Sequence, residues 1–302
     1  MEKMRVILDT DIGPDCDDTG ALVILNLLCD EGACELLAVT HCTGSPFGVP
    51  TISAINRCFG RRVPIGTCKN TNFLSTGAAL VYTPSVAREF PHDFPEVAEQ
   101  PGAVEVLRAA LSPVPDRSVT MIAIGPMNNL AAALADEACR ELIESKVQRL
   151  VAMAGSFQAD KRFAEWNVEQ DISAAKRVIR DWPSPILLCP FEVGENILTG
   201  ASLEKYPDNP VSLSYRLYTN GCMLRPSWDL VTVIAAVLGE EALLPRSTLG
   251  RIVVTEKGET LFVPQPDGVH QYMQPSSNSF ALTSQIESLL DRAASVMCMH
   301  SH

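Results

Sequence analysis

The sequence has no apolar stretch long enough to span a membrane. Its longest apolar runs lie near residues 20–28 and 230–238, well below the roughly 20 residues that cross a bilayer. The chain begins MEKMRVILDTD, and no apolar segment of the signal-peptide type precedes its first predicted strand. These absences predict a soluble, cytoplasmic protein with no membrane partner.

Basic residues are also scarce. The chain has 24 lysine and arginine residues against 36 aspartate and glutamate residues, which gives a formal net charge of −12. A negative field of this kind repels phosphate polymers, so a nucleic-acid partner is not expected. Clustered carboxylates are, however, the groups with which proteins bind hard divalent cations.

None of the ten cysteines forms a CxxC pair. Several lie in apolar stretches, where a thiol behaves as a small buried hydrophobe, so we expect reduced, structural cysteines. No cluster of histidine and cysteine accompanies the aspartates, which disfavours a zinc site.

Short aliphatic runs alternate with helical patterns along the chain. This alternation is typical of βαβ units and predicts an α/β fold, with a mostly parallel, Rossmann-like sheet flanked by helices. No linker or repeat divides the sequence, so we expect a single domain over residues 1–302. Two strand-like runs in residues 251–270 predict a small antiparallel C-terminal addition, and residues 69–101 are expected to form a long loop. The expected strands are 4–8, 36–40, 63–66, 119–124, 149–153 and 186–189, and the expected helices 19–28, 51–59, 104–111, 128–135 and 172–179.

The most informative segment is DTDIGPDCDD, residues 9–18. Five carboxylates lie within ten positions, directly after an apolar strand and before a helix. An aspartate that caps the helix would explain one of them. The other carboxylates repel one another unless a cation or protons compensate their charge. The segment therefore predicts a cation site at the carboxyl end of the first strand.

This segment resembles the DxDPGxDD motif of the inosine-uridine-preferring nucleoside hydrolase family, with two extra residues between Gly13 and the final aspartate pair. Three later segments continue the resemblance in the same order. They are AIGPMNNLAAAL at residues 123–134, MAGSF followed by AEWN at residues 153–157 and 164–167, and RPSWDLVTVIAAVL at residues 225–238.

The resemblance implies hydrolysis of the N-glycosidic bond of a ribonucleoside or related N-riboside, which releases free base and ribose. It implies metal ligation by Asp11, Asp18, Asp229 and the backbone carbonyl of Ile124. Asp11 is our candidate for the base that activates a metal-bound water. A sugar diol that completes a shell of six to eight oxygens favours Ca²⁺ over Mg²⁺. The family also commonly forms dimers or tetramers, so a homo-oligomer is expected.

The resemblance also suggests substrate contacts. Glu165 and Asn167 match residues that bind ribose hydroxyls, Asp17 is expected to do the same, and the extra residues make Asp15 a competitor of Asp17. The chain departs from the family where Ser45 replaces an asparagine that serves the sugar.

A second departure concerns the leaving base, because Trp228 stands where many members have a histidine that protonates it. Trp228 can stack on a base but cannot donate a proton. The candidate donors are His41, Tyr218, His270 and Tyr272, with His41 preferred because it follows a strand that ends at the expected site.

Two alternative functions stay open. A catalytically weak nucleoside-binding protein of the same fold is consistent with the departures at Trp228 and Ser45. A haloacid-dehalogenase-like phosphatase would use Asp9 as nucleophile and Asp11 as acid and base. That alternative is weaker, because no late acidic pair for Mg²⁺ follows a strand.

Overall fold

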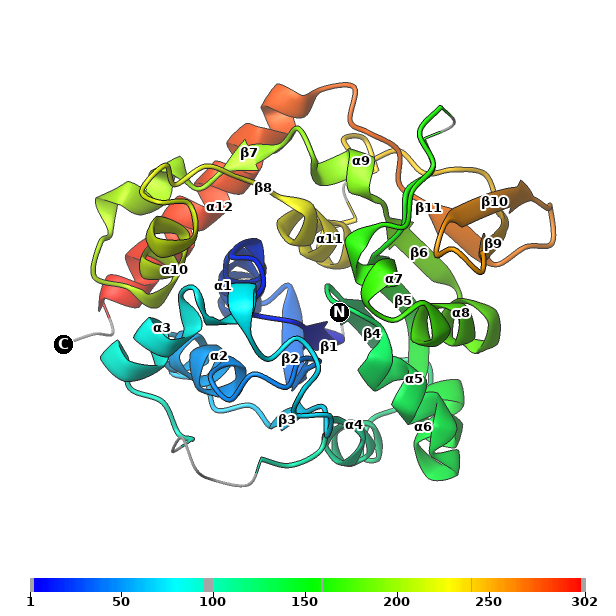
Figure 1. Ribbon diagram of the computed structural model, residues 1–302, viewed down its shortest axis with the longest axis horizontal. Coiled ribbons are helices and arrows are strands. Elements are labelled where there is room, and N and C mark those ends of the chain that lie inside the picture. The colour runs from blue at the N-terminus through cyan, green and yellow to red at the C-terminus, as the bar shows by residue number, and fades with distance from the viewer. Residues whose placement is uncertain (1–2, 95–99, 159, 240, 300–302) are drawn as a thin grey trace.

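A computed structural model describes residues 3–94, 100–158, 160–239 and 241–299 of the chain. Its centre is a nine-stranded sheet in the order β10-β9-β11-β6-β5-β4-β1-β2-β3 (Figure 1). The seven strands from β11 to β3 run parallel, whereas β9 is antiparallel to both of its neighbours. The strands are Met4–Thr10 (β1), Cys34–His41 (β2), Ile65–Thr67 (β3), Val119–Ala123 (β4), Val147–Met153 (β5), Ile186–Cys189 (β6), Gly250–Val254 (β9), Thr260–Pro264 (β10) and His270–Tyr272 (β11).

Helices cover both faces of this sheet, so its central strands are buried on both sides. One face carries the helices Asp17–Asp30 (α1), Gly48–Arg57 (α2), Thr83–Glu89 (α3), Pro210–Tyr218 (α10), Trp228–Val237 (α11) and Ser279–Met299 (α12). The other face carries Ala103–Leu111 (α4), Asn128–Ala135 (α5), Glu137–Lys146 (α6) and Ile172–Asp181 (α8). The remaining elements are short: Trp166–Gln170 (α7), Phe191–Gly194 (α9), Leu198–Thr199 (β7), Arg225–Pro226 (β8), and the 3₁₀ turns Gly77–Leu80 (η1) and Ala201–Lys205 (η2).

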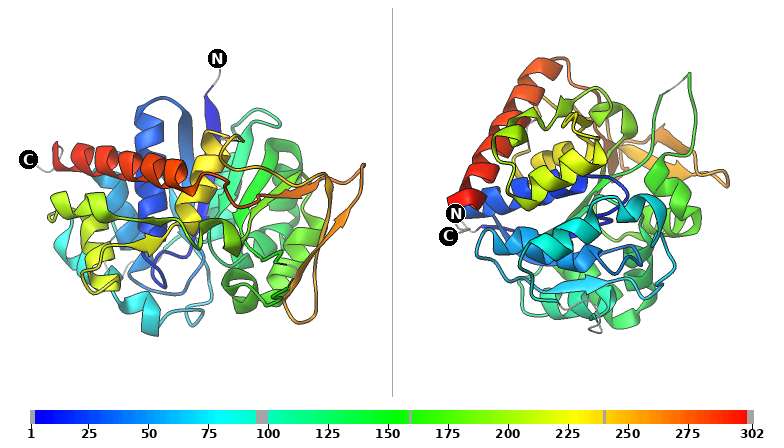
Figure 2. Two further views of the ribbon diagram at one scale, coloured as in Figure 1. Left: turned by 90° about the horizontal axis from the view of Figure 1, so that it is seen from above. Right: turned by 60° about the vertical axis from the view of Figure 1, so that its left-hand side comes forward.

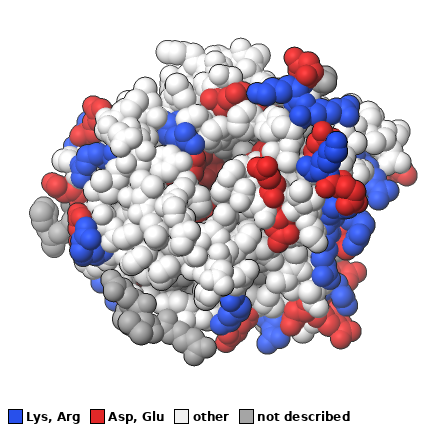
Figure 3. All heavy atoms as spheres, in the orientation of Figure 1, with Lys and Arg blue, Asp and Glu red and all other residues white. Residues whose placement is uncertain are grey.

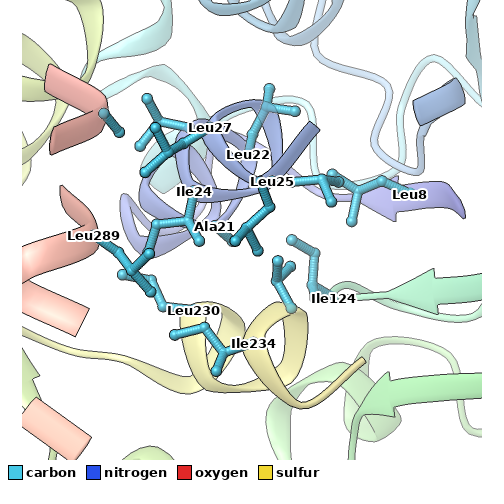
Figure 4. Close-up of a cluster of buried hydrophobic side chains, with 14 of the residues drawn as sticks. Leu8, Ala21, Leu22, Ile24, Leu25, Leu27, Ile124, Leu230, Ile234 and Leu289 are labelled. Carbon is cyan, nitrogen blue, oxygen red and sulfur yellow. The ribbon is translucent and has the colours of Figure 1, made fainter. Parts of the chain in front are cut away.

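Alternate side chains of β1 enter two separate hydrophobic clusters, as the period of a strand requires. Val6 and Leu8 pack with α1, whereas Ile7 packs on the opposite face. Helix α1 is itself buried along most of its length, since α11 and α12 cover the side that faces away from the sheet (Figures 2 and 4). The segment that follows β1 is therefore anchored at both of its ends.

The strand order reverses at β1, which lies between β2 and β4. Loops that leave adjacent strands in opposite directions open a crevice at this point, and ligands of open α/β sheets bind there. The loop after β1 contains the aspartate cluster, and Ile124 directly follows β4. The topology therefore brings these segments, which are distant in sequence, to one edge of the sheet.

The mostly parallel sheet, its flanking helices and the antiparallel C-terminal strands confirm the predicted fold class. The long loop predicted for residues 69–101 is wrong, because this stretch contains η1 and α3. Helix α3 has seven residues, too few for a clear apolar period, and only three of them are buried. In the described residues, no helix has the length and apolarity of a membrane span.

Candidate active site

Three carboxylates meet at the crevice beside β1. Asp17 and Asp18 open α1, Asp229 lies in the first turn of α11, and one oxygen of each lies within 4.8 Å of the others. All three side chains are buried. The backbone N–H of Asp229 donates to Oδ2 of Asp17 at 3.1 Å, so α11 is joined directly to the start of α1.

Asp11 lies beside this triad and lines the same cavity. A Cβ atom on Gly125 would lie 2.6 Å from Oδ1 of Asp11 and 2.8 Å from Sγ of Cys42. Only glycine at position 125 therefore leaves room for the Asp11 side chain in its observed position. Asp18 accepts a short hydrogen bond from the Thr10 hydroxyl, which orients one of its two oxygens.

The electrostatics of the cluster fit a divalent cation. Burial, followed by repulsion from neighbouring carboxylates, raises the pKa of Asp17, Asp18 and Asp229 well above the ordinary value. Burial is also the main cause of the raised pKa of Asp11. A bound cation reverses this balance, because it favours the ionised carboxylates. The buried triad could thus hold a metal ion, and its oxygen-only donor set suits a hard one.

The carboxylates form the floor of a cavity of about 350 Å³. Figure 3 shows acidic atoms at the bottom of a hollow in this face of the molecule. Ile124 and Met153 also line the cavity, and the rest of the lining contains a polar and an aromatic group of residues. The lining residues are Asp11, Pro14, Asp15, Asp17, Asp18, Ala78, Ile124, Met153, Glu165, Trp166, Asn167, Phe191, Tyr218, Arg225, Trp228 and Asp229.

One wall is polar and is built on the start of α7. Glu165 is the N-cap of α7, and its carboxylate accepts hydrogen bonds from the backbone N–H groups of Gly155, Asn167 and Val168. The Asn167 amide donates to the Met153 carbonyl at 3.1 Å. Burial raises the pKa of Glu165 to about 7. Glu165 and Asn167 thus combine a structural role with a place in the cavity.

A second part of the lining is aromatic and is called the aromatic wall. The Trp228 indole N–H donates to the Phe191 carbonyl at 2.8 Å, and the two rings lie 5.4 Å apart. Tyr218 and Arg225 continue this wall, and Arg225 forms an ion pair with Asp15. A polar wall, an acidic floor and an aromatic wall suit a ligand with one hydroxylated and one planar part.

Two predicted site residues lie away from the described cavity lining. The fully buried His41 ring contacts the Ile12 carbonyl at 3.2 Å and the Thr43 hydroxyl at 3.0 Å, and burial lowers its pKa to about 4. Ser45 is buried too, and its hydroxyl accepts from the Phe47 backbone at 3.4 Å, ahead of α2.

Of the four candidate proton donors, Tyr218 alone belongs to the described cavity lining. His270 accepts from the Ile252 backbone on the far side of the sheet, and Tyr272 stacks on Phe157 with the ring centroids 4.1 Å apart.

The two loop aspartates have different surroundings, since Asp17 joins the triad and Asp15 forms an ion pair with Arg225. Sequence reasoning assigned no role to Arg225, although it begins the RPSWDL segment. The sequence did contain a signal for such a residue, because an extra carboxylate next to an acidic cluster is stabilised by a positively charged partner.

The chain was compared with known proteins. None of the curated proteins compared with it matched. Among solved structures, the purine-preferring ribonucleoside hydrolase from Gardnerella vaginalis has a TM-score of 0.76 at 19% identity, over 98% of this chain and 99% of that chain. The inosine-uridine preferring nucleoside hydrolase from Bacillus anthracis has a TM-score of 0.70 at 20% identity, over 97% and 99%. The type III effector protein XopQ complexed with adenosine diphosphate ribose has a TM-score of 0.68 at 16% identity, over 97% and 94%.

The family comparison is decisive, because the model of the inosine-uridine preferring nucleoside hydrolases matches residues 6–262. The match contains every element that contributes to the cavity, from the aspartate loop to α11. The chain therefore belongs to the inosine-uridine preferring nucleoside hydrolase family, and it is a hydrolase that acts on small N-ribosides.

Proposed function

We propose that this protein hydrolyses the N-glycosidic bond of ribonucleosides, or of a related N-riboside, with the help of a calcium ion. The observation that carries the proposal is the convergence of four buried aspartates in one cavity, whose lining also contains a polar wall and an aromatic wall. The polar wall suits ribose hydroxyls, and the aromatic wall suits a planar base.

The side chains of Asp11, Asp18 and Asp229 and the carbonyl of Ile124 would hold the ion. Asp17 lies within the same triad as Asp18 and Asp229, so it would bind a sugar hydroxyl close to the ion. When bound, calcium lowers the pKa of a coordinated water and fixes its position.

Asp11 would accept the proton of the attacking water as its oxygen adds to the anomeric carbon. The sugar then passes through an oxocarbenium-like transition state, whose positive charge the buried carboxylates stabilise. Glu165 and Asn167 would bind the ribose hydroxyls, and Trp228 would stack on the base. His41 and Ser45 lie outside the cavity lining and would act only through the residues that surround them.

The test is release of ribose from purine and pyrimidine nucleosides, with calcium and then with a chelator. We expect calcium-dependent release by the wild-type protein and at least a ~1000-fold loss in Asp11→Asn, because one group that acts in the transition state is removed. Asp116→Asn is the matched control, since Asp116 is 72% exposed and pairs with Lys146. Calcium-independent release, or full activity of Asp11→Asn, would contradict the proposal.

A catalytically weak nucleoside-binding protein is the second candidate. It is favoured by Trp228 in the position of a proton-donating histidine and by the structural likeness to an effector protein complexed with adenosine diphosphate ribose. Saturable binding of a nucleoside in calorimetry, without ribose release, would identify it. The phosphatase alternative is disfavoured, because its nucleophile Asp9 is fully buried and accepts hydrogen bonds from Thr40 and Asn129.

A further inference from the structure

Arg225 is held in one orientation by Asp15. Its Nε atom donates to Oδ1 of Asp15 at 2.9 Å, and its Nη2 atom donates to Oδ2. A two-point contact between a guanidinium fork and a carboxylate fixes the plane of the arginine as well as its position. Arg225 lies in β8, three residues before Trp228 and four before Asp229, so its backbone is placed by the helix that also positions the metal site.

Two aromatic rings contact the same guanidinium. Cζ of Arg225 lies 5.2 Å from the ring centroid of Tyr218 and 5.3 Å from that of Trp228. Contacts of this length are cation–π interactions. Three groups therefore restrain Arg225, and its side chain is only about 30% exposed.

Asp15 belongs to the two-residue insertion that separates this chain from the DxDPGxDD motif. The insertion is tied to η1 and α3 because the Tyr82 hydroxyl donates to the Asp15 carbonyl at 2.6 Å. Within the loop, the backbone N–H of Cys16 donates to Oδ1 of Asp15 at 2.6 Å. A carboxylate added beside the triad would otherwise increase the negative charge at the cavity, and Arg225 neutralises it. The insertion thus adds a neutral, oriented ion pair to the cavity wall.

Within the described residues, Nη1 of Arg225 has no protein acceptor, since Nε and Nη2 make the contacts to Asp15. Arg225 lines the cavity and contacts the Trp228 ring, which lines it too. We propose that Nη1 donates a hydrogen bond to the leaving base and stabilises it as an anion, so that the reaction needs no proton donor. This inference rests on the proposed N-riboside hydrolysis. Asp15 then acts as a positioning residue.

The step balances without a general acid. The C1′–N bond breaks with its electron pair on the base nitrogen, water adds its hydroxide to C1′, and Asp11 takes the water proton. The base departs as an anion next to the guanidinium and gains a proton from solvent after release. Such a site favours bases that carry an acceptor beside the glycosidic nitrogen and spread negative charge well, as the carbonyls of a uracil-type pyrimidine do.

The experiment compares wild type, Arg225→Gln and Arg225→Lys on two kinds of riboside. The first kind is a series of uridines with fluoro, hydrogen or methyl substituents on the base, which differ in how well the base carries negative charge. The second is para-nitrophenyl β-D-riboside, whose leaving group is already a stable anion. We expect Arg225→Gln to lower kcat on uridine about 100-fold, the usual effect of removing one oriented donor. We expect little change on the nitrophenyl riboside.

A structural defect would lower kcat for all substrates alike. The informative measurement is therefore how kcat depends on the acidity of the leaving group. The slope of log kcat against leaving-group acidity should be steeper in Arg225→Gln than in wild type, with an intermediate slope in Arg225→Lys and in Asp15→Asn. Arg216→Gln, on exposed α10 surface, is the matched control and should follow wild type. If Arg225→Gln folds poorly, Arg225→Lys carries the test.

An equal loss on both kinds of riboside, with an unchanged slope, would overturn the role of Arg225 while leaving the hydrolase function intact. Absence of hydrolysis of either kind by the wild-type protein would overturn the hydrolase function and this inference with it.

Discussion

The carboxylate of Glu165 both caps a helix and faces the cavity, and its burial makes it sensitive to pH. Its pKa is raised from 4.5 to about 7 in the folded protein, so between these values the folded chain holds more protons than the unfolded chain. Stability must therefore fall as pH rises through this window, by up to about 3 kcal/mol from this group alone. Thermal melts of calcium-free protein across the window measure the fall.

The Glu165→Gln variant separates this effect from general instability. Loss of one carboxylate oxygen as a backbone acceptor should lower its stability below pH 4.5, and the decline between pH 4.5 and about 7 should become shallower because glutamine does not ionise. Glu204→Gln, at an exposed position in η2, should keep the wild-type decline. An unchanged slope in Glu165→Gln would show that other carboxyl groups cause the pH dependence.

The aspartates should divide into metal ligands and a base. Asp18→Asn and Asp229→Asn remove a charge from the site of the proposed ion, so the calcium concentration for half-maximal activity should rise at least ~10-fold. Asp11→Asn should instead act mainly on kcat, because Asp11 is the proposed base for the water proton. Calcium titrations of activity distinguish the two, and equal calcium dependence in all three variants would contradict this division.

For single residues of the site, the sequence motifs were most informative at positions that directly follow a strand. They pointed to Asp11, Asp17, Asp18, Ile124 and Asp229, which line one cavity in the structure. The first four follow parallel strands that share one edge of the sheet, and the roles of all five stay predictions. They could not tell which side chain after β2 faces the cavity, so His41 and Ser45 were expected there. Arg225 was missed because its partner Asp15 is 210 positions away in the chain.

At the scale of elements, the contact between α1 and α11 controls the site. Gly20 of α1 lies against both α10 and α11, because a Cβ atom there would lie 2.5 Å from the Tyr215 hydroxyl of α10 and 3.1 Å from the Leu230 side chain of α11. Gly20→Ala should therefore destabilise the protein by about 1–3 kcal/mol, although alanine favours helices by about 1 kcal/mol elsewhere. Chemical denaturation measures the change.

The double variant Gly20→Ala/Tyr215→Phe tests the cause, because it removes the hydroxyl that the new methyl group meets. It should recover part of the lost stability relative to Gly20→Ala, after correction for Tyr215→Phe alone. Activity should follow the same order, since a shift of α11 moves Asp229 away from Asp17. If the stability of the double variant equals that expected from adding the effects of the two single substitutions, this contact is excluded as the cause.

Several elements were predictable from the sequence with their bounds, and others were not. Helix α5 and strand β6 have the bounds that were predicted, and the 251–270 hairpin is present as β9 and β10. Helix α3 and the two-residue strands β7 and β8 are set by tertiary contacts. Helix α12 was overlooked, although its buried residues Leu282, Ile286, Leu289 and Ala293 recur at helical spacing.

At the scale of the whole molecule, calcium should stabilise the fold, because a ligand that binds only the folded state adds free energy to it. At calcium 100-fold above its dissociation constant the gain is about 2.7 kcal/mol. The melting temperature should rise by several degrees in wild type and much less in Asp229→Asn. The single-domain organisation of residues 1–302 stays a prediction that the same melts check, since one domain unfolds in one transition.

The homo-oligomeric state and the cytoplasmic location also stay predictions. Light scattering coupled to gel filtration should give twice or four times the 32.7 kDa of one chain. A mass of one chain at micromolar concentration would contradict the expected dimer or tetramer.

The hydrogen bond between Asp17 and Asp229 spans 212 positions and sets the order of events during synthesis. A nascent chain that has emerged only as far as α10 has the first aspartates but not the fourth, and it also lacks the ion pair between Asp15 and Arg225. Closing so long a loop is entropically costly and slow. The aspartate cluster is therefore completed late, and binding of the proposed calcium ion would report on chains in which the first and last thirds of the matched region have already met.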